Sequence, residues 1–215
     1  MKAIVVAGGD AVPSDAAQLA EADLVIAADS GAAWLASIGV VPDVVIGDMD
    51  SIDPELLSRL AADGATIERH PVDKDRSDAE LAVGRAIAAG ADEVVVLGAL
   101  GGERVDHALA NLLLLSDRGW ATTDLRIVRG GTLARALQGG GRLGLEGGDG
   151  DLVTLISVDG DATGVRTEGL RYALSGETLA LGRSRGLSNE IEHAPATVSL
   201  ERGTLLVIET RKEST

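Results

Sequence analysis

Short apolar runs alternate with Ala- and Leu-rich amphipathic segments over roughly the first 130 residues, and this alternation constrains the fold most strongly. Runs that are apolar throughout are typical of parallel strands buried on both faces, and amphipathic segments between them are typical of covering helices. The expected strands are Ala3–Ala7, Leu24–Ala28, Val44–Ile46, Thr66–Arg69, Glu93–Leu97 and Leu125–Val128. The expected helices are Ser14–Ala20, Ala32–Ile38, Pro54–Ala62, Asp78–Ala89 and Asp106–Asp117. The sequence therefore predicts an α/β fold with a mostly parallel, doubly wound sheet.

The pattern changes after residue 130, where runs of glycine separate short β-prone segments. Such spacing is typical of hairpin strands in a small antiparallel sandwich or barrel. The expected strands are Leu152–Val158, Thr163–Thr167, Thr178–Leu181, Thr197–Leu200 and Thr204–Glu209. We therefore expect two domains, an α/β domain over residues 1–135 and a small all-β sandwich domain over residues 136–215.

Composition argues against several classes of function. The formal net charge of −15 disfavours a general polyanion-binding surface, and the scarcity of aromatic residues disfavours stacking on single-stranded nucleic acid. The absence of Cys excludes disulfides, thiolate catalysis and Cys-based zinc sites. No apolar run approaches the ~18 residues of a membrane span, and the apolar stretch at the N-terminus is too short for a signal peptide. We expect a cytoplasmic protein that binds neither nucleic acid nor membranes.

Three acidic clusters follow expected strands or precede expected helices. They are Gly47-Asp48-Met49-Asp50-Ser51, Asp73-Lys74-Asp75-Arg76-Ser77-Asp78 and Gly101-Gly102-Glu103-Arg104-Val105-Asp106-His107. Ligands of parallel sheets bind outside the carboxyl ends of the strands. Mg²⁺ prefers carboxylate and phosphate oxygens, while glycine lets backbone N–H groups approach phosphate and Lys or Arg neutralises the remaining charge. The clusters therefore indicate a magnesium–polyphosphate site in an ATP-using transferase.

Each cluster also has a simpler explanation when it is taken alone. A single Asp after a strand is more often a helix or turn cap, and the cluster around Lys74 is compatible with a solvated loop whose ion pairs contribute ~0–1 kcal/mol. A single His near a helix start, such as His107, is usually structural. The chain contains neither a Walker phosphate loop nor a Rossmann fingerprint. The clusters in combination favour the site over these alternatives.

In this order, the motifs resemble those of the thiamine pyrophosphokinase family. The matching stretches are Ala28–Gly31, Pro42-Asp43 before Gly47–Ser51, Asp73–Leu81, Gly98–Asn111, and Gly169–Tyr172 followed by Leu179 and Gly186–Glu190. The resemblance spans nearly the whole chain. It implies an α/β nucleotide-binding domain followed by a β-sandwich, and a homodimer that binds thiamine between its subunits. The implied reaction is Mg²⁺-assisted transfer of pyrophosphate from ATP to the hydroxyethyl group of thiamine, giving thiamine diphosphate and AMP.

The resemblance also implies roles for the carboxylates. Asp48, Asp50 and Asp78 are expected to coordinate Mg²⁺ directly or through water, with Asp29 as a supporting carboxylate. Either Asp50 or Asp106 would accept the proton of the attacking hydroxyl group.

The remaining candidate residues are expected to bind the substrates. Lys74 and Arg104 would hold phosphate oxygens, and Arg104 would do so with a planar, bidentate contact. His107 and Asn111 are four residues apart and share a helix face near these phosphates. The expected hydrogen-bonding partners of the thiamine aminopyrimidine are Ser188 and Asn189.

Two departures and two alternatives remain open at this point. Glu103 separates Gly102 from Arg104, which predicts a one-residue bulge in the family's Gly-Gly-Arg motif, and Tyr172 is the one aromatic residue after residue 135. One alternative is a pyrophosphokinase for another hydroxyalkyl heterocycle, such as a hydroxymethylpterin. The other is a non-catalytic sensor of nucleotide or thiamine diphosphate. Such a sensor should lack some of the expected metal-binding carboxylates, and all of them are present in this sequence.

Overall fold

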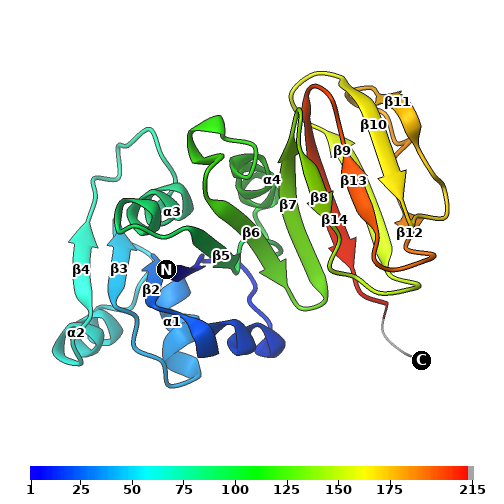
Figure 1. Ribbon diagram of the computed structural model, residues 1–215. Coiled ribbons are helices and arrows are strands. Elements are labelled where there is room, and N and C mark those ends of the chain that lie inside the picture. Colours follow the sequence, from blue (N-terminus) through cyan, green and yellow to red (C-terminus); the bar gives the residue numbers. More distant parts are fainter. Residues whose placement is uncertain (213–215) are drawn as a thin grey trace. The chain divides into compact units, whose positions relative to one another are not determined.

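The computed structural model describes residues 1–212 and divides into two compact units. The α/β unit comprises residues 1–114 and 119–130, and the β unit comprises residues 115–118 and the chain from residue 131 (Figure 1). No helix among the described residues is both long enough and apolar enough to cross a membrane.

The α/β unit is built on a parallel sheet whose strands follow the order β6-β5-β1-β2-β3-β4. The strands are β1 (Lys2–Val6), β2 (Leu24–Ala28), β3 (Val44–Gly47), β4 (Thr66–Arg69), β5 (Glu93–Leu97) and β6 (Asp124–Arg129). Because β1 pairs with β2 on one side and with β5 on the other, the strand order reverses there. In open α/β sheets such a reversal opens a crevice at the carboxyl ends of the strands.

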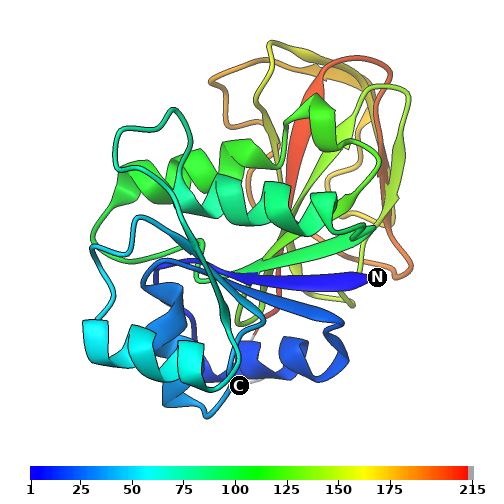
Figure 2. The same ribbon diagram turned by 90° about the vertical axis from the view of Figure 1, so that its left-hand side faces the viewer.

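Helices cover both faces of this sheet. They are η1 (Pro13–Glu21, a 3₁₀-helix), α1 (Gly31–Ser37), α2 (Pro54–Ala62), α3 (Asp78–Ala88) and α4 (Val105–Leu114), with a short 3₁₀ turn η2 at Arg118–Trp120. Figure 2 shows α3 and α4 on one face and η1, α1 and α2 on the other. The Asp53 carboxylate caps α2 by accepting from the N–H of Glu55, and the Ser77 hydroxyl caps α3 by accepting from the N–H of Glu80. Asp before a proline at the first helical position and Ser three residues before Glu are sequence patterns that favour such caps.

The β unit is an antiparallel sandwich. One sheet has the order β12-β9-β14-β7, and the other has the order β11-β10-β13-β8. The strands are β7 (Thr132–Gln138), β8 (Arg142–Gly144), β9 (Leu152–Ser157), β10 (Ala162–Glu168), β11 (Ser175–Leu179), β12 (Asn189–Glu190), β13 (Thr197–Ser199) and β14 (Thr204–Thr210). Its core is aliphatic and draws on both sheets, as Leu155 and Leu205 from one and Val165 and Val198 from the other show. The expected fold class is confirmed.

Several local features differ from the expectations, among them the short strands β8 and β12, which were not predicted. The segment expected as a helix at Ser14–Ala20 forms the 3₁₀-helix η1. Strand β7 was not predicted, because its sequence Thr-Leu-Ala-Arg-Ala-Leu-Gln contains good helix formers. Pairing with β14 along its whole length overrides that propensity, and a buried ion pair joins Arg135 Nη2 to Glu209 Oε1 at 2.6 Å.

Replacing Gly84 with Ala should stabilise the protein. Gly84 lies inside α3, and a Cβ added there would meet nothing within 4 Å. Ala is favoured over Gly in a helix interior by about 1 kcal/mol, so Gly84→Ala should raise the free energy of unfolding in urea by about 0.5–1 kcal/mol. Gly31→Ala is the matched control, because its Cβ would collide with the carbonyl oxygen of Val6 and should destabilise the fold. A loss of stability in Gly84→Ala would contradict this account of α3.

Candidate active site

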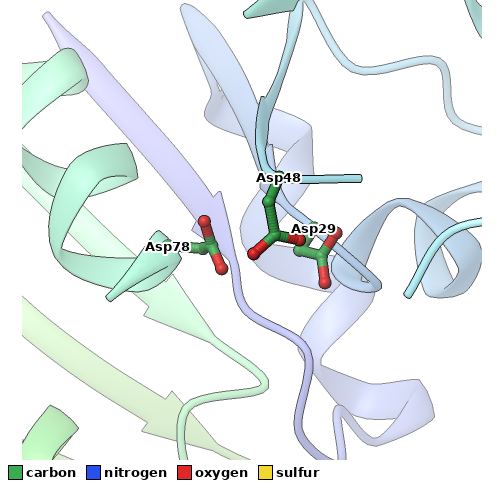
Figure 3. A group of neighbouring side chains, drawn as sticks. All are labelled: Asp29, Asp48 and Asp78. Carbon is green, nitrogen blue, oxygen red and sulfur yellow. The ribbon is translucent and has the colours of Figure 1, made fainter. Parts of the chain in front are cut away.

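Three carboxylates converge at the carboxyl edge of the parallel sheet. Asp29 directly follows β2, Asp48 directly follows β3, and Asp78 is the first residue of α3. One carboxylate oxygen from each lies within 4.8 Å of the other two (Figure 3). The convergence follows from strand register. Ala28 of β2 pairs with Ile46 of β3, so the segments that follow these two strands leave the sheet side by side.

The backbone around these carboxylates is unusual. A Cβ at Gly47 would lie 3.1 Å from Asp78 Oδ1 and 3.2 Å from Asp29 Cβ, so glycine leaves the room that the two side chains occupy. Asp29 and Met49 adopt left-handed backbone conformations with φ of 47° and 69°. Such conformations are uncommon outside glycine, and they concentrate at functional sites when the surrounding structure holds them in place.

The electrostatics of the cluster favour a cation. Burial raises the pKa of Asp29, and the neighbouring carboxylates of Asp78 and Asp48 raise it further. The buried Oδ1 atom of Asp29 accepts no hydrogen bond from the described residues, and the buried Oδ1 atom of Asp78 has only the Lys74 ammonium, 3.0 Å away, beside it. Buried oxygens without a donor are rare in folded proteins. A cation bound among the three carboxylates would satisfy them.

Lys74 supplies part of that positive charge. Its Nζ lies 3.3 Å from Asp48 Oδ2 and 3.0 Å from Asp78 Oδ1. Burial lowers the pKa of Lys74, but the adjacent carboxylates of Asp78 and Asp48 outweigh burial and hold the pKa above its ordinary value. The pKa of Asp48 is lowered, chiefly because the backbone N–H of Asp50 donates to its Oδ1 at 3.1 Å, and Lys74 adds to the effect.

The Asp50 carboxylate lies outside this group. Its Oδ1 accepts from the hydroxyl of Ser51 at 3.0 Å, and the cluster within mutual reach consists of Asp29, Asp48 and Asp78. The sequence predicts Asp48, Asp50 and Asp78 as metal ligands and Asp29 as a supporting carboxylate, and a role of Asp50 in metal binding stays a prediction. The structure instead brings the Asp29 carboxylate to the cluster.

A cavity of about 650 Å³ opens beside the cluster. Its volume falls within the range of small-molecule sites. The predicted residues that line it are Asp29, Lys74, Asp78, Arg104, Asp106, His107 and Asn111. Asn111 Nδ2 donates to the carbonyl oxygen of Ala99 at 2.9 Å and so fixes the loop after β5, whereas His107 is exposed.

Glycines from two loops form another part of the cavity wall. The loops follow β1 and β5, at the reversal in strand order, and the N–H of Gly9 donates to the carbonyl oxygen of Gly98 at 2.8 Å. A Cβ at Gly9 would lie 2.5 Å from that oxygen, which is too close for any side chain. Glycine therefore allows the two loop backbones to approach this closely. The sequence alone does not reveal this role of Gly9, because its packing partner Gly98 lies almost ninety positions away in the chain.

Arg104 and Asp106 pair with each other at the cavity rim. Arg104 Nε lies 2.9 Å from Asp106 Oδ1, and Nη2 lies 2.6 Å from Oδ2. This hydrogen bonding holds the pKa of Asp106 far below its usual range. An Asp106 carboxylate in that state is a weak proton acceptor.

In the β unit, Ser188 and Asn189 lie together but behave differently. Ser188 has a left-handed backbone with φ of 56°, and its N–H donates to Thr154 Oγ1 at 3.2 Å. Asn189 is buried, with its Oδ1 accepting from the N–H groups of Tyr172 and Glu190 and its Nδ2 donating to the Tyr172 carbonyl. Asn189 therefore fixes the position of Tyr172, whose residue surface is 55% exposed. A direct contact of Asn189 with thiamine stays a prediction.

Two family models match this chain. The model described as thiamin pyrophosphokinase, catalytic domain, matches residues 16–128, and the model described as thiamin pyrophosphokinase, vitamin B1 binding domain, matches residues 143–205. The chain belongs to the thiamine pyrophosphokinase family. The first match contains the carboxylate cluster and all of the cavity lining except Ala7, Gly8 and Gly9, and the second contains Ser188 and Asn189.

Individual relatives agree with the family assignment. Thiamine pyrophosphokinase of Bacillus subtilis is 27% identical over 212 residues, which cover 97% of this chain and 98% of that protein. Thiamine pyrophosphokinase 2 of Oryza sativa subsp. japonica is 28% identical over 182 residues, covering 80% of this chain and 66% of the rice protein. The crystal structure of the Bacillus subtilis enzyme superimposes with a TM-score of 0.88, covering 99% of this chain and 100% of that chain.

Removing a clustered carboxylate should weaken divalent-ion binding. Asp29→Asn and Asp78→Asn should each lower the affinity for Mn²⁺ by at least about tenfold, since the loss of even an outer-shell partner costs that much in metal sites. The measurement is Mn²⁺ titration followed by electron paramagnetic resonance, with the α,β-methylene analogue of ATP present. Asp50→Asn is the matched control, because its carboxylate lies outside the cluster. An equal loss of affinity in Asp50→Asn would show that the ion is bound by the set expected from the sequence.

Proposed function

We propose that this protein transfers a pyrophosphoryl group from ATP to the hydroxyethyl group of thiamine, giving thiamine diphosphate and AMP. The observation that carries the proposal is the convergence of Asp29, Asp48 and Asp78 beside a glycine-walled cavity, in a chain that matches both family models. No specific observation favours a hydroxymethylpterin as acceptor or a sensor without activity.

The carboxylate cluster suits Mg²⁺. Its ligand atoms are hard oxygens, and one of them, Asp29 Oδ1, is buried without a hydrogen-bond donor among the described residues. Asp29, Asp48 and Asp78 would hold the ion directly or through water. When bound, the ion would neutralise phosphate charge and so stabilise the transferring group.

The other cavity residues would orient the polyphosphate. Transfer of a phosphoryl-type group depends on charge neutralisation and in-line positioning more than on covalent protein chemistry. Lys74 and Arg104 line the cavity as cations, and Lys74 is held by carboxylates that an anionic substrate would replace. The glycine loops after β1 and β5 allow a phosphate to approach the backbone closely. His107 and Asn111 lie along the same wall.

Of the two carboxylates suggested as proton acceptor, Asp50 is the better choice. Asp106 is paired with Arg104, which holds the pKa of Asp106 far below its usual range and makes it a weak base. The Asp50 carboxylate accepts one hydrogen bond, from the neighbouring Ser51 hydroxyl, and adjoins the ion-binding cluster through its backbone contact with Asp48. We therefore assign the proton of the attacking hydroxyl group to Asp50.

The product analysis tests this function directly. Purified protein is incubated with Mg-ATP and thiamine, and the products are identified by chromatography and mass. The proposal predicts AMP and thiamine diphosphate in equal amounts. ADP with thiamine monophosphate would keep the substrate but reject pyrophosphoryl transfer, and turnover with a hydroxymethylpterin in place of thiamine would reject the acceptor.

Ser188 is proposed to hydrogen-bond the aminopyrimidine of thiamine. Ser188→Ala should raise the KM for thiamine about three- to tenfold, as expected for one lost hydrogen bond, and leave the KM for ATP near its original value. Ser184→Ala, in the same loop, is the control for a general effect of removing a hydroxyl group. A change confined to the KM for ATP would move Ser188 out of the thiamine site.

The functional unit is proposed to be a homodimer, and α4 offers an apolar surface for it. No residue of α4 is buried, and Val105 and Leu109, four residues apart, are 78% and 56% exposed. Helical residues at this spacing share a face, and exposed apolar surface favours association. Leu109→Glu should therefore convert a dimer into a monomer in light scattering, whereas Ala61→Glu on the exposed face of α2 should not. A dimer that persists in Leu109→Glu would exclude this face as the interface.

A further inference from the structure

Lys74 lies among the carboxylates that are proposed to bind the divalent ion. Its Nζ contacts Asp48 Oδ2 at 3.3 Å and Asp78 Oδ1 at 3.0 Å, and its side chain is only 14% exposed. The Oδ1 atom of Asp29, the third member of the cluster, has no hydrogen-bond partner among the described residues. The ammonium group therefore occupies two of the three carboxylates in the protein without nucleotide.

We propose that Lys74 is a positioning residue that neutralises Asp48 and Asp78 until nucleotide binds, then moves to the phosphates and frees both carboxylates for the divalent ion. The consequence is that the ion and the nucleotide bind cooperatively. This inference rests on the proposed function, because it takes the ligand of Lys74 to be a polyphosphate.

Competition follows from the chemistry of the two cations. Mg²⁺ binds carboxylate oxygens at about 2.0–2.1 Å and demands near-octahedral geometry. An ammonium group that contacts Asp48 Oδ2 and Asp78 Oδ1 takes up lone pairs of the same carboxylates and repels an incoming ion at short range. Removal of Lys74 without replacement would leave three carboxylates in mutual repulsion. A bound divalent ion would relieve that repulsion.

The location of Lys74 permits the movement. It lies in the segment between β4 and α3, outside any helix or strand, and its flanking residues Asp73 and Asp75 are exposed. Four methylene groups let the Lys74 ammonium reach different partners without a change in the backbone. The cavity that Lys74 lines would present phosphate oxygens as the new partners.

Cooperativity of this kind is reciprocal and can be measured by binding alone. The affinity for Mn²⁺ is determined by electron paramagnetic resonance in the absence and in the presence of the α,β-methylene analogue of ATP, whose α–β bond does not transfer. The wild-type protein should bind Mn²⁺ weakly alone and more tightly with the analogue, within the range of about 5–150-fold that is typical of such coupling.

Lys74→Met should tighten Mn²⁺ binding without nucleotide by about tenfold and reduce the enhancement by the analogue. Lys74→Arg restores the cation and should restore weak binding of Mn²⁺ alone. Arg76→Met is the matched charge control, because Arg76 lines the same cavity and has no ion pair with the described carboxylates. Its effect on Mn²⁺ alone should stay within about twofold, as exposed charges are screened by salt.

Two results would overturn the proposal. If Lys74→Met binds Mn²⁺ alone no more tightly than the wild type, Lys74 does not compete with the ion. If Arg76→Met tightens binding as much as Lys74→Met, the effect reflects net charge and not occupancy of the carboxylates. A Lys74-dependent coupling in a protein that makes no thiamine diphosphate would reject the proposed function and leave this inference standing.

Discussion

Repulsion among three carboxylates held within 4.8 Å is the interaction on which this structure depends. Asp29, Asp48 and Asp78 come from separate segments, and each would be better solvated apart from the others. The register of β2 and β3 and the start of α3 hold them together regardless. The fold thus maintains an unfavourable charge arrangement that a cation relieves. In the free protein the cation is Lys74, and in the working enzyme we propose that it is Mg²⁺.

Close backbone packing makes that arrangement possible. Gly47 leaves room for two of the carboxylates, and Gly9 and Gly98 bring the loops after β1 and β5 into contact at the reversal in strand order. Nearly the whole supporting core is aliphatic, so little beyond strand pairing and tight apolar packing positions the site. The α/β unit that holds the carboxylate cluster therefore also forms the wall of the cavity in which we propose that a polyphosphate lies.

The parallel sheet could be predicted because its buried strands are apolar nearly throughout, and β2 and β5 match their expected bounds. The edge strand β4 also matches its expected bounds, although it has no buried residue. Strand β7 could not be predicted, because its state depends on pairing with β14 and not on its own propensity. The acidic clusters located the site, but spacing does not show where a side chain points. Asp50 and Asp29 each follow a strand, and the backbone turn alone decides which one joins the cluster. Likewise, the sequence could not reveal that the side-chain amide of Asn189 hydrogen-bonds the backbone N–H and carbonyl groups of Tyr172.

The central claim is that Asp29, Asp48 and Asp78 act together as one divalent-ion site. Crystals grown with Mn²⁺ and the α,β-methylene analogue of ATP would test it through the anomalous scattering of the ion. We predict a manganese peak in contact with this cluster, directly or through one water, with Lys74 moved from Asp48 and Asp78 to a phosphate oxygen. A manganese peak on Asp50 and away from Asp29, or Lys74 still bound to both carboxylates beside the ion, would contradict the account.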